Sequence, residues 1–119
     1  MSRHSARVFL TDMLEYATEA AALATSRSRS DLDGDRMFEL ALIRLLEVVG
    51  EAARQMPQSA RSQYPQIPWH AIASFRNRIA HAYRDVDLDR VWQIVQDDLP
   101  ALIPMLEAIL AALPDAPMP

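Results

Sequence analysis

The sequence predicts an all-α protein, an up-and-down bundle of four main helices with one helical turn in a connecting segment. Half of the 119 residues are hydrophobic, only two are glycine, and the hydrophobic residues recur at three- and four-residue steps over long segments. A chain of this length is long enough for one compact core. We therefore expect a single helical domain over residues 1–119, with a frayed tail at 114–119.

The first two helices are predicted from amphipathic patterns on either side of a polar segment. Residues 3–24 form the first pattern, and its second half is rich in alanine, which allows close helix packing. Residues 25–35 have the composition of a loop. We expect Asp33 or Asp35 to cap a second helix that runs over residues 36–56. Gly50 in the middle of that helix costs about 1 kcal/mol relative to alanine, which indicates close approach by another helix there.

The third helix is expected after a proline-containing connector, residues 57–68, with one helical turn at 58–63. Pro68 fits the first turn of the helix that follows. Hydrophobic residues then fall on one helical face, namely Trp69, Ile72, Phe75, Ile79 and Tyr83. The opposite face carries a polar stripe of His70, Ser74, Asn77 and His81.

The last helix is expected to be long and bent. Asp85 and Asp87 are candidates for its N-cap. Pro100 and Pro104 lie inside its hydrophobic pattern, and each removes a backbone donor. We expect a bend near residues 97–101 rather than two separate helices.

Charge and residue usage limit the possible functions. The net charge of −4 argues against nonspecific nucleic-acid binding over the whole surface, but it allows a local basic pocket. All twelve cationic residues are arginine, whose planar guanidinium suits phosphate. The chain has no cysteine, and its three histidines have no recognisable ligand spacing, so we expect neither a metal site nor a cofactor. The sequence has no signal-peptide pattern and no membrane-length apolar run, so we expect a cytoplasmic protein.

The segment Arg76-Asn77-Arg78-Ile79-Ala80-His81-Ala82-Tyr83 is the main functional candidate. In a straight helix Arg76 and His81 would be about 140° apart around the axis and roughly 7.5 Å apart along it. For both to act on one phosphate, the helix must loosen near His81 or a second copy of the chain must complete the pocket. Asn77 precedes His81 by four residues, so on a helix its amide can orient the imidazole ring.

The spacing Arg76-x4-His81-x-Tyr83, followed by an Asp-Val-Asp helix start, resembles the HepT-like toxins of the HEPN superfamily. The resemblance extends from about Asp35 to Leu113 and includes residues 45–53 (LLEVVGEAA), 64–69 (YPQIPW), 91–92 (VW) and 98–100 (DLP). It implies a homodimeric, metal-independent endoribonuclease with Arg76 and His81 as the catalytic pair. It also implies an MntA-like nucleotidyltransferase antitoxin that adenylylates Tyr83 and silences the enzyme.

Ribonuclease chemistry suits these side chains. The substrate's 2′-hydroxyl can attack the adjacent phosphorus if a protein group takes its proton and another stabilises the growing negative charge. Histidine exchanges protons near neutral pH, and arginine can hold phosphoryl oxygens. Asn77 and Arg78 are expected to support the pair, and Glu51 is a candidate to buttress Arg76 or His81 from the neighbouring helix.

Each candidate residue also has a structural alternative. His81 can be a surface histidine at a helix C-terminus, where positive charge is favoured. Tyr83 can be a core aromatic residue, and Glu51 can belong to a solvated, salt-bridged face. For the whole protein, the alternatives are a non-catalytic subunit that binds a nucleotidyltransferase, or a plain dimerising bundle.

Overall fold

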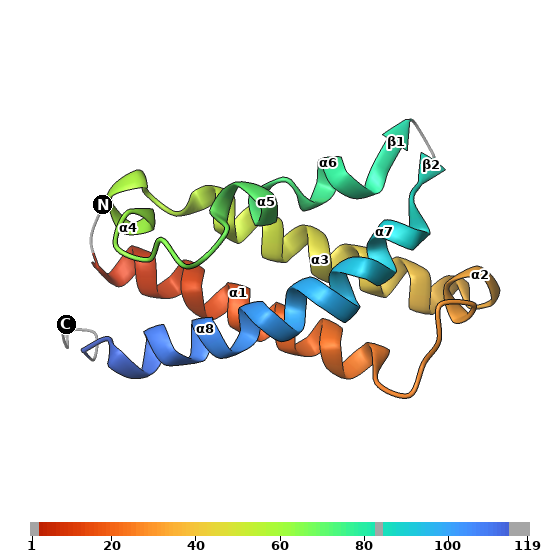
Figure 1. The fold of residues 1–119 in the computed structure, drawn as a ribbon, viewed down its shortest axis with the longest axis horizontal. Helices are drawn as coiled ribbons and strands as arrows, with labels where there is room; N and C mark the ends of the chain where they lie inside the picture. The colour runs from red at the N-terminus through yellow and green to blue at the C-terminus, as the bar shows by residue number, and fades with distance from the viewer. Residues whose placement is uncertain (1–2, 83–84, 115–119) are drawn as a thin grey trace.

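The computed structural model describes residues 3–82 and 85–114, with side chains described from Ala6 to Ala80 and from Asp85 to Pro114. Its long helices lie along the longest dimension of a molecule that measures 47 × 29 × 26 Å (Figure 1). The long helices are α1 (Arg3–Ala24), α3 (Arg36–Gln55) and α8 (Leu99–Ala112). The all-α prediction is confirmed. In the described part of the chain no helix has both the length and the apolar character that a membrane crossing requires.

Helix α1 packs against α3 on one side and α8 on the other (Figure 1). Its inner face is fully buried at Leu10, Met13, Ala17 and Ala20. The small side chains in its second half let α3 approach closely, as the sequence predicted. Every residue of the main core is hydrophobic, so helix packing is driven by removal of apolar surface from water.

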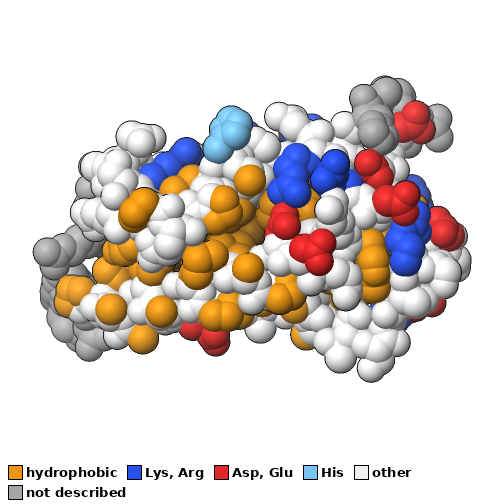
Figure 2. Space-filling model, in the orientation of Figure 1, with side chains coloured by type: hydrophobic (Ala, Val, Ile, Leu, Met, Phe, Trp, Pro, Cys, Tyr) orange, Lys and Arg blue, Asp and Glu red, His pale blue; other side chains and the backbone are white. Residues whose placement is uncertain are grey.

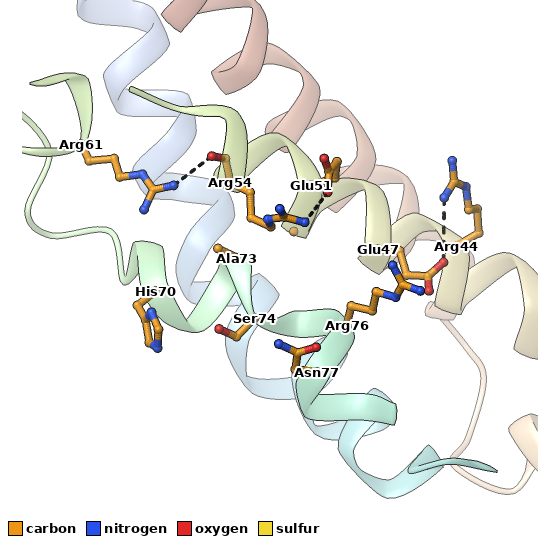
Figure 3. Close-up of a pocket in the computed structure, with 11 residues that line it drawn as sticks. Arg44, Glu47, Glu51, Arg54, Arg61, His70, Ala73, Ser74, Arg76 and Asn77 are labelled. Atoms are coloured by element: carbon orange, nitrogen blue, oxygen red, sulfur yellow. Dashed lines mark hydrogen bonds and ion pairs between the residues drawn. The ribbon is translucent and has the colours of Figure 1, made fainter. Parts of the chain in front are cut away.

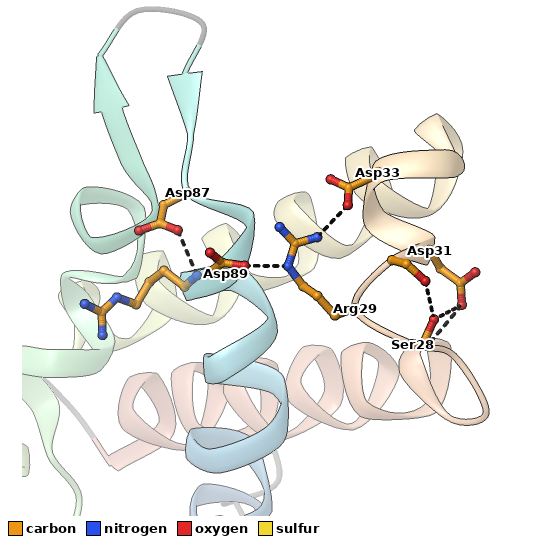
Figure 4. Close-up of polar contacts among 8 residues, drawn as sticks. Ser28, Arg29, Asp31, Asp33, Asp87 and Asp89 are labelled. Carbon is orange, nitrogen blue, oxygen red and sulfur yellow. Dashed lines mark hydrogen bonds and ion pairs between the residues drawn. The ribbon is translucent and has the colours of Figure 1, made fainter.

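The connection between α1 and α3 differs from the predicted loop, because it contains a one-turn helix, α2 (Asp31–Gly34). The carboxylate of Asp31 accepts a hydrogen bond of 2.8 Å from the backbone amide of Ser28, which closes the preceding turn (Figure 4). Leu32 is fully buried and anchors the helix to the core. Arg29 lies between Asp33, at 3.1 Å, and Asp89, at 2.7 Å, and so joins this connection to the start of the last helix (Figure 4).

Asp35 caps α3, and it is one of the two residues, Asp33 and Asp35, that the sequence predicted for this role. Its carboxylate accepts a hydrogen bond of 3.1 Å from the amide of Phe38 and pairs with Arg27 at 3.2 Å. These hydrogen bonds, above all the one from the Phe38 amide, lower the pKa of Asp35 below its ordinary value. Because the pKa of Asp35 is lower in the folded protein than in the unfolded chain, its ionised form stabilises the fold. This stabilisation is fully present at a pH above the pKa in the unfolded chain. It is lost as the pH falls through the pKa in the folded protein.

After α3 the chain forms α4 (Gln58–Arg61), which confirms the helical turn predicted in the connector. Arg61 turns back to the end of α3, where its guanidinium donates to the carbonyls of Ala53, Arg54 and Met56 at 3.0–3.1 Å. Carbonyls at the end of a helix lack the full set of intrahelical partners, so Arg61 acts as a C-terminal cap.

The third predicted helix is not continuous. It consists of α5 (Trp69–Ala73) and α6 (Phe75–Ile79), with a break at Ser74. The prediction that the helix reaches Tyr83 is wrong, because α6 ends at Ile79 and the chain enters a hairpin of β1 (Ala80–Ala82) and β2 (Asp85–Val86). The Ile79 carbonyl accepts a hydrogen bond from the amide of Asp87 at 2.5 Å, which ties the end of α6 to the residue after β2. Pro68 precedes α5 as its N-cap residue rather than lying in its first turn.

The last helix begins with α7 (Leu88–Gln93), which Asp87 caps by accepting from the amide of Arg90 at 3.0 Å. Asp85, the other predicted cap, lies in β2. A π-helical turn, η1 (Ile94–Asp98), then leads into α8 without a loop. In this turn the amide of Leu99 bonds to the carbonyl of Ile94, five residues back. Pro100 explains the widening, since its ring crowds the preceding turn and it has no donor. The irregularity therefore begins three residues before the predicted bend and overlaps it at residues 97–98.

Charged and hydrophobic side chains separate on the face seen in Figure 2. Hydrophobic side chains cover the half of this face formed by α5 and α8, whereas arginine and acidic side chains gather near α7 and the hairpin.

Candidate functional site

The candidate site is a groove of about 830 Å³ between α3 and the segment α5–α6 (Figure 3). Arg76 and Asn77 line it from α6, and His70 and Ser74 line it from α5 and the break that follows. The described part of the predicted polar stripe thus lies along one groove. His81 follows on β1, where the structure describes its backbone but not its side chain, and Tyr83 lies outside the described residues.

Gly50 determines how closely the two walls of the groove approach. A Cβ atom at this position would lie 3.0 Å from the carbonyl oxygen of Ile72 and 3.5 Å from the Cβ of Phe75. The first distance is shorter than ordinary van der Waals contact, so only glycine fits without displacement of α5. The close approach predicted at Gly50 is confirmed, and α5–α6 is the segment that makes it.

Arg76 is exposed, and within the described part of the chain its guanidinium has no hydrogen bond or ion pair. Figure 3 shows the side chain extending from α6 toward α3. It is therefore available to an anionic ligand without first losing a partner.

The change from helix to strand after Ile79 alters the expected relation between Arg76 and His81. Residues 80–82 are extended, so the 140° separation of an ideal helix does not apply. Of the two arrangements that the sequence left open, loosening of the helix before His81 is present within one chain. The helical i, i+4 contact predicted between Asn77 and His81 loses its basis for the same reason.

Arg78 does not line the groove. Its guanidinium is held by the carboxylate of Asp98 at 2.9 Å and the carbonyl of Ala71 at 3.5 Å, and it lies 5.4 Å from the ring centroid of Phe75. Arg78 therefore links α6 to the π-helical turn. Its support for the groove is indirect, because it fixes the helix from which Arg76 and Asn77 project.

The groove wall on α3 carries two arginine–glutamate pairs. Arg54 binds Glu51 at 3.2 Å, and Arg44 lies 3.9 Å from Glu47 (Figure 3). Glu51 also accepts a hydrogen bond of 3.1 Å from Gln55. The described partners of Glu51, Arg54 and Gln55, thus lie on its own helix. This is the structural alternative given for Glu51 in the sequence analysis, a residue of a salt-bridged face. Glu51 still faces the same groove as Arg76.

Sequence reasoning did not assign Arg44, Arg54 and Arg61 to the site. The groove brings them together with Arg76 on a protein whose net charge is −4. Arg44 and Arg54 share one face of α3 with Glu47 and Glu51, and Gly50 marks the adjacent close approach. Charged residues on one face of α3 next to a glycine were the features of the sequence that could have indicated this wall of the groove. Among the residues described, no three histidine or acidic side chains are grouped to hold a metal ion.

Comparison with known proteins gives consistent matches. The family described as Ribonuclease HepT-like matches residues 13–109. A candidate RNase of Methanocaldococcus jannaschii is 30% identical over 109 residues, which cover 92% of this chain and 100% of the relative. A protein of Thermococcus cleftensis that bears the name ribonuclease HepT, qualified as probable, is 36% identical over 95 residues, or 76% of this chain and 86% of the relative. No solved structure gives a significant match. The matched residues span most of the bundle and the whole groove, and the chain belongs to the HepT-like ribonuclease family.

Proposed function

We propose that this protein is a metal-independent endoribonuclease, the toxin of a toxin–antitoxin pair, with Arg76 and His81 as its catalytic residues. The observation that carries the proposal is the state of Arg76. Its guanidinium is exposed and has no bonded partner among the described residues, in a groove with three further arginines, five positions before His81. Membership of the HepT-like ribonuclease family supports RNA as the substrate.

The reaction needs only the RNA and protein side chains. The 2′-oxygen attacks the adjacent phosphorus as His81 takes its proton, and the bond from phosphorus to the 5′-oxygen breaks. The leaving 5′-oxygen takes a proton from solvent water and His81 later releases its own to solvent, which leaves a 2′,3′-cyclic phosphate and a 5′-hydroxyl. Arg76 stabilises the negative charge that grows on the phosphoryl oxygens. Asn77 lines the groove beside Arg76, where its amide can donate to the phosphate.

The working form is proposed to be a homodimer, with the motif segments of two copies facing each other across a cleft. The groove supports this arrangement because most of the residues that line it are polar or charged. Two-fold symmetric pairs are the commonest oligomers.

Expression and RNA cleavage test the proposal. Wild-type protein is expected to arrest growth and to cleave RNA in the presence of EDTA. His81→Ala is expected to do neither, because loss of an acid–base group typically slows a reaction by about 10²–10⁴-fold. If both proteins are harmless and leave RNA intact, the protein is not this enzyme.

Tyr83 is proposed as the regulatory site, with a nucleotidyltransferase antitoxin of the MntA type as the partner. Transfer of AMP to its hydroxyl would place a bulky anion two residues from His81, where it competes with RNA phosphate through occupancy and charge. Incubation with such a partner and ATP is expected to add the mass of AMP to the wild type but not to Tyr83→Phe. Equal labelling of the two proteins would assign the modification to another residue.

A further inference from the structure

The α3 wall of the groove carries charged residues that the catalytic proposal does not use. Arg44, Glu47, Glu51 and Arg54 lie at steps of three, four and three residues, so they share one face of the helix. From Arg44 to Arg54 this row spans about 15 Å of helix axis. Arg76 faces the row from α6 across the groove (Figure 3). We propose, on the basis of the ribonuclease function proposed above, that this row binds the sugar–phosphate backbone of single-stranded RNA beside the scissile linkage, with Arg44 and Arg54 as its phosphate contacts.

The charge of the groove favours a polyanion. Its lining has four arginines and two glutamates, a local excess of positive charge on a chain whose net charge is −4. An extended anionic strand is therefore drawn to this groove rather than to the rest of the surface. Arg61 is the least available of the four, because it is already bonded to three carbonyls at the end of α3.

The arginines of the row can exchange their present partners for phosphate. Arg44 and Glu47 are 3.9 Å apart, and the pair of Arg54 and Glu51 is more than half exposed on both sides. Exposed pairs of this kind contribute little, whereas guanidinium and phosphate form charge-assisted, two-pronged hydrogen bonds. The two glutamates therefore compete with RNA phosphate for the arginines.

The lining also indicates which parts of the RNA the row contacts. Among the described residues of the lining there is no phenylalanine, tyrosine or tryptophan on which bases could stack, and His70 contributes an imidazole ring. The row itself consists of arginine and glutamate, so its contacts with RNA are expected to be with phosphates and to carry little sequence preference. Cleavage through the 2′-oxygen requires a linkage that can align attacking and leaving oxygens, which an unpaired strand permits more readily than an A-form helix.

The test measures binding separately from cleavage. In the His81→Ala protein, binding of a labelled, mixed-sequence single-stranded RNA is followed by fluorescence anisotropy over a range of salt concentrations. Arg44→Ala and Arg54→Ala are each expected to weaken binding several-fold. Each is also expected to reduce the slope of log K against log salt by about 0.7, the value for one lost phosphate contact with a single strand.

Two control substitutions lie on the same helix outside the groove. Arg36 forms an i, i+3 pair with Glu39 at 2.6 Å, as Arg54 does with Glu51. Arg36→Ala is expected to leave the salt slope unchanged.

Glu51→Gln is expected to tighten RNA binding roughly two- to fivefold, because it removes a carboxylate that competes with phosphate for Arg54. Its control, Glu39→Gln, is expected to leave RNA binding unchanged.

If Arg44→Ala and Arg54→Ala bind RNA as Arg36→Ala does, the row is not an RNA-binding surface, even where wild-type protein cleaves RNA in EDTA. If the two substitutions instead dissociate a dimer in analytical ultracentrifugation and leave the affinity per protomer unchanged, the row is an interface between copies. If the wild type neither binds nor cleaves RNA, the ribonuclease function fails together with this inference.

Discussion

Arg76→Ala is expected to cleave RNA about 10²–10³-fold more slowly than the wild type, the range for loss of one group that stabilises transition-state charge. Its free energy of unfolding is expected to stay within about 0.5 kcal/mol of wild type, because Arg76 is exposed and unpaired in the described structure. Single-turnover cleavage rates and urea unfolding, followed on the same preparations, measure the two effects.

Arg78→Ala provides the matched comparison two residues away. The ion pair of Arg78 with Asp98 is about a quarter exposed on the arginine side and a third exposed on the aspartate side, at 26% and 33%. Its loss is expected to lower stability by about 1–2 kcal/mol, between the values for exposed and buried pairs. A destabilised Arg76→Ala protein would show that Arg76 has a structural role, and undiminished cleavage would show that Arg76 is not catalytic.

Gly50→Val is expected to lower the free energy of unfolding by about 2–3 kcal/mol and to slow RNA cleavage as well. The Cβ atom alone would lie 3.0 Å from the backbone carbonyl oxygen of Ile72, and the two γ-carbons need further room. A backbone atom cannot move aside as a flexible side chain can, so α5–α6 must shift away from α3. That shift moves Arg76 relative to the α3 wall of the groove.

Gly34→Val is the control for the general effect of replacing glycine. Nothing lies within 4 Å of a Cβ atom at Gly34. Its substitution is expected to change stability by no more than about 0.5 kcal/mol. Urea unfolding measures the free energy of unfolding of both variants. Similar decreases in this free energy for Gly50→Val and Gly34→Val would show that α3 and α5–α6 are not in tight contact at Gly50.

The regular parts of the fold follow from local sequence. The bounds of α1 agree with those predicted, and α3 ends one residue earlier, because each has an uninterrupted apolar stripe and α3 has the capping carboxylate of Asp35. Burial of Trp69, Ile72, Phe75 and Ile79 also followed from periodicity. In each of these cases the determining interactions lie within a few residues.

The features that sequence did not predict depend on contacts between segments. Ile79 has the periodicity of a continuing helix, but its carbonyl is taken by Asp87 across the hairpin. Ser28 and Asp31 stabilise a helical turn in a segment with loop composition. Arg44 and Arg54 were not assigned to the site from the sequence, because their relation to Arg76 depends on how α3 meets α5–α6.

The chemistry of the RNA ends tests the central claim most directly. Wild-type protein is incubated in EDTA with an RNA and with the same sequence lacking 2′-hydroxyls, and the products are identified by mass spectrometry. We predict that only the RNA is cut, with 2′,3′-cyclic phosphate and 5′-hydroxyl ends that do not form with Arg76→Ala or His81→Ala. Cleavage of the strand without 2′-hydroxyls, or ends with a 5′-phosphate and a 3′-hydroxyl, would contradict the mechanism.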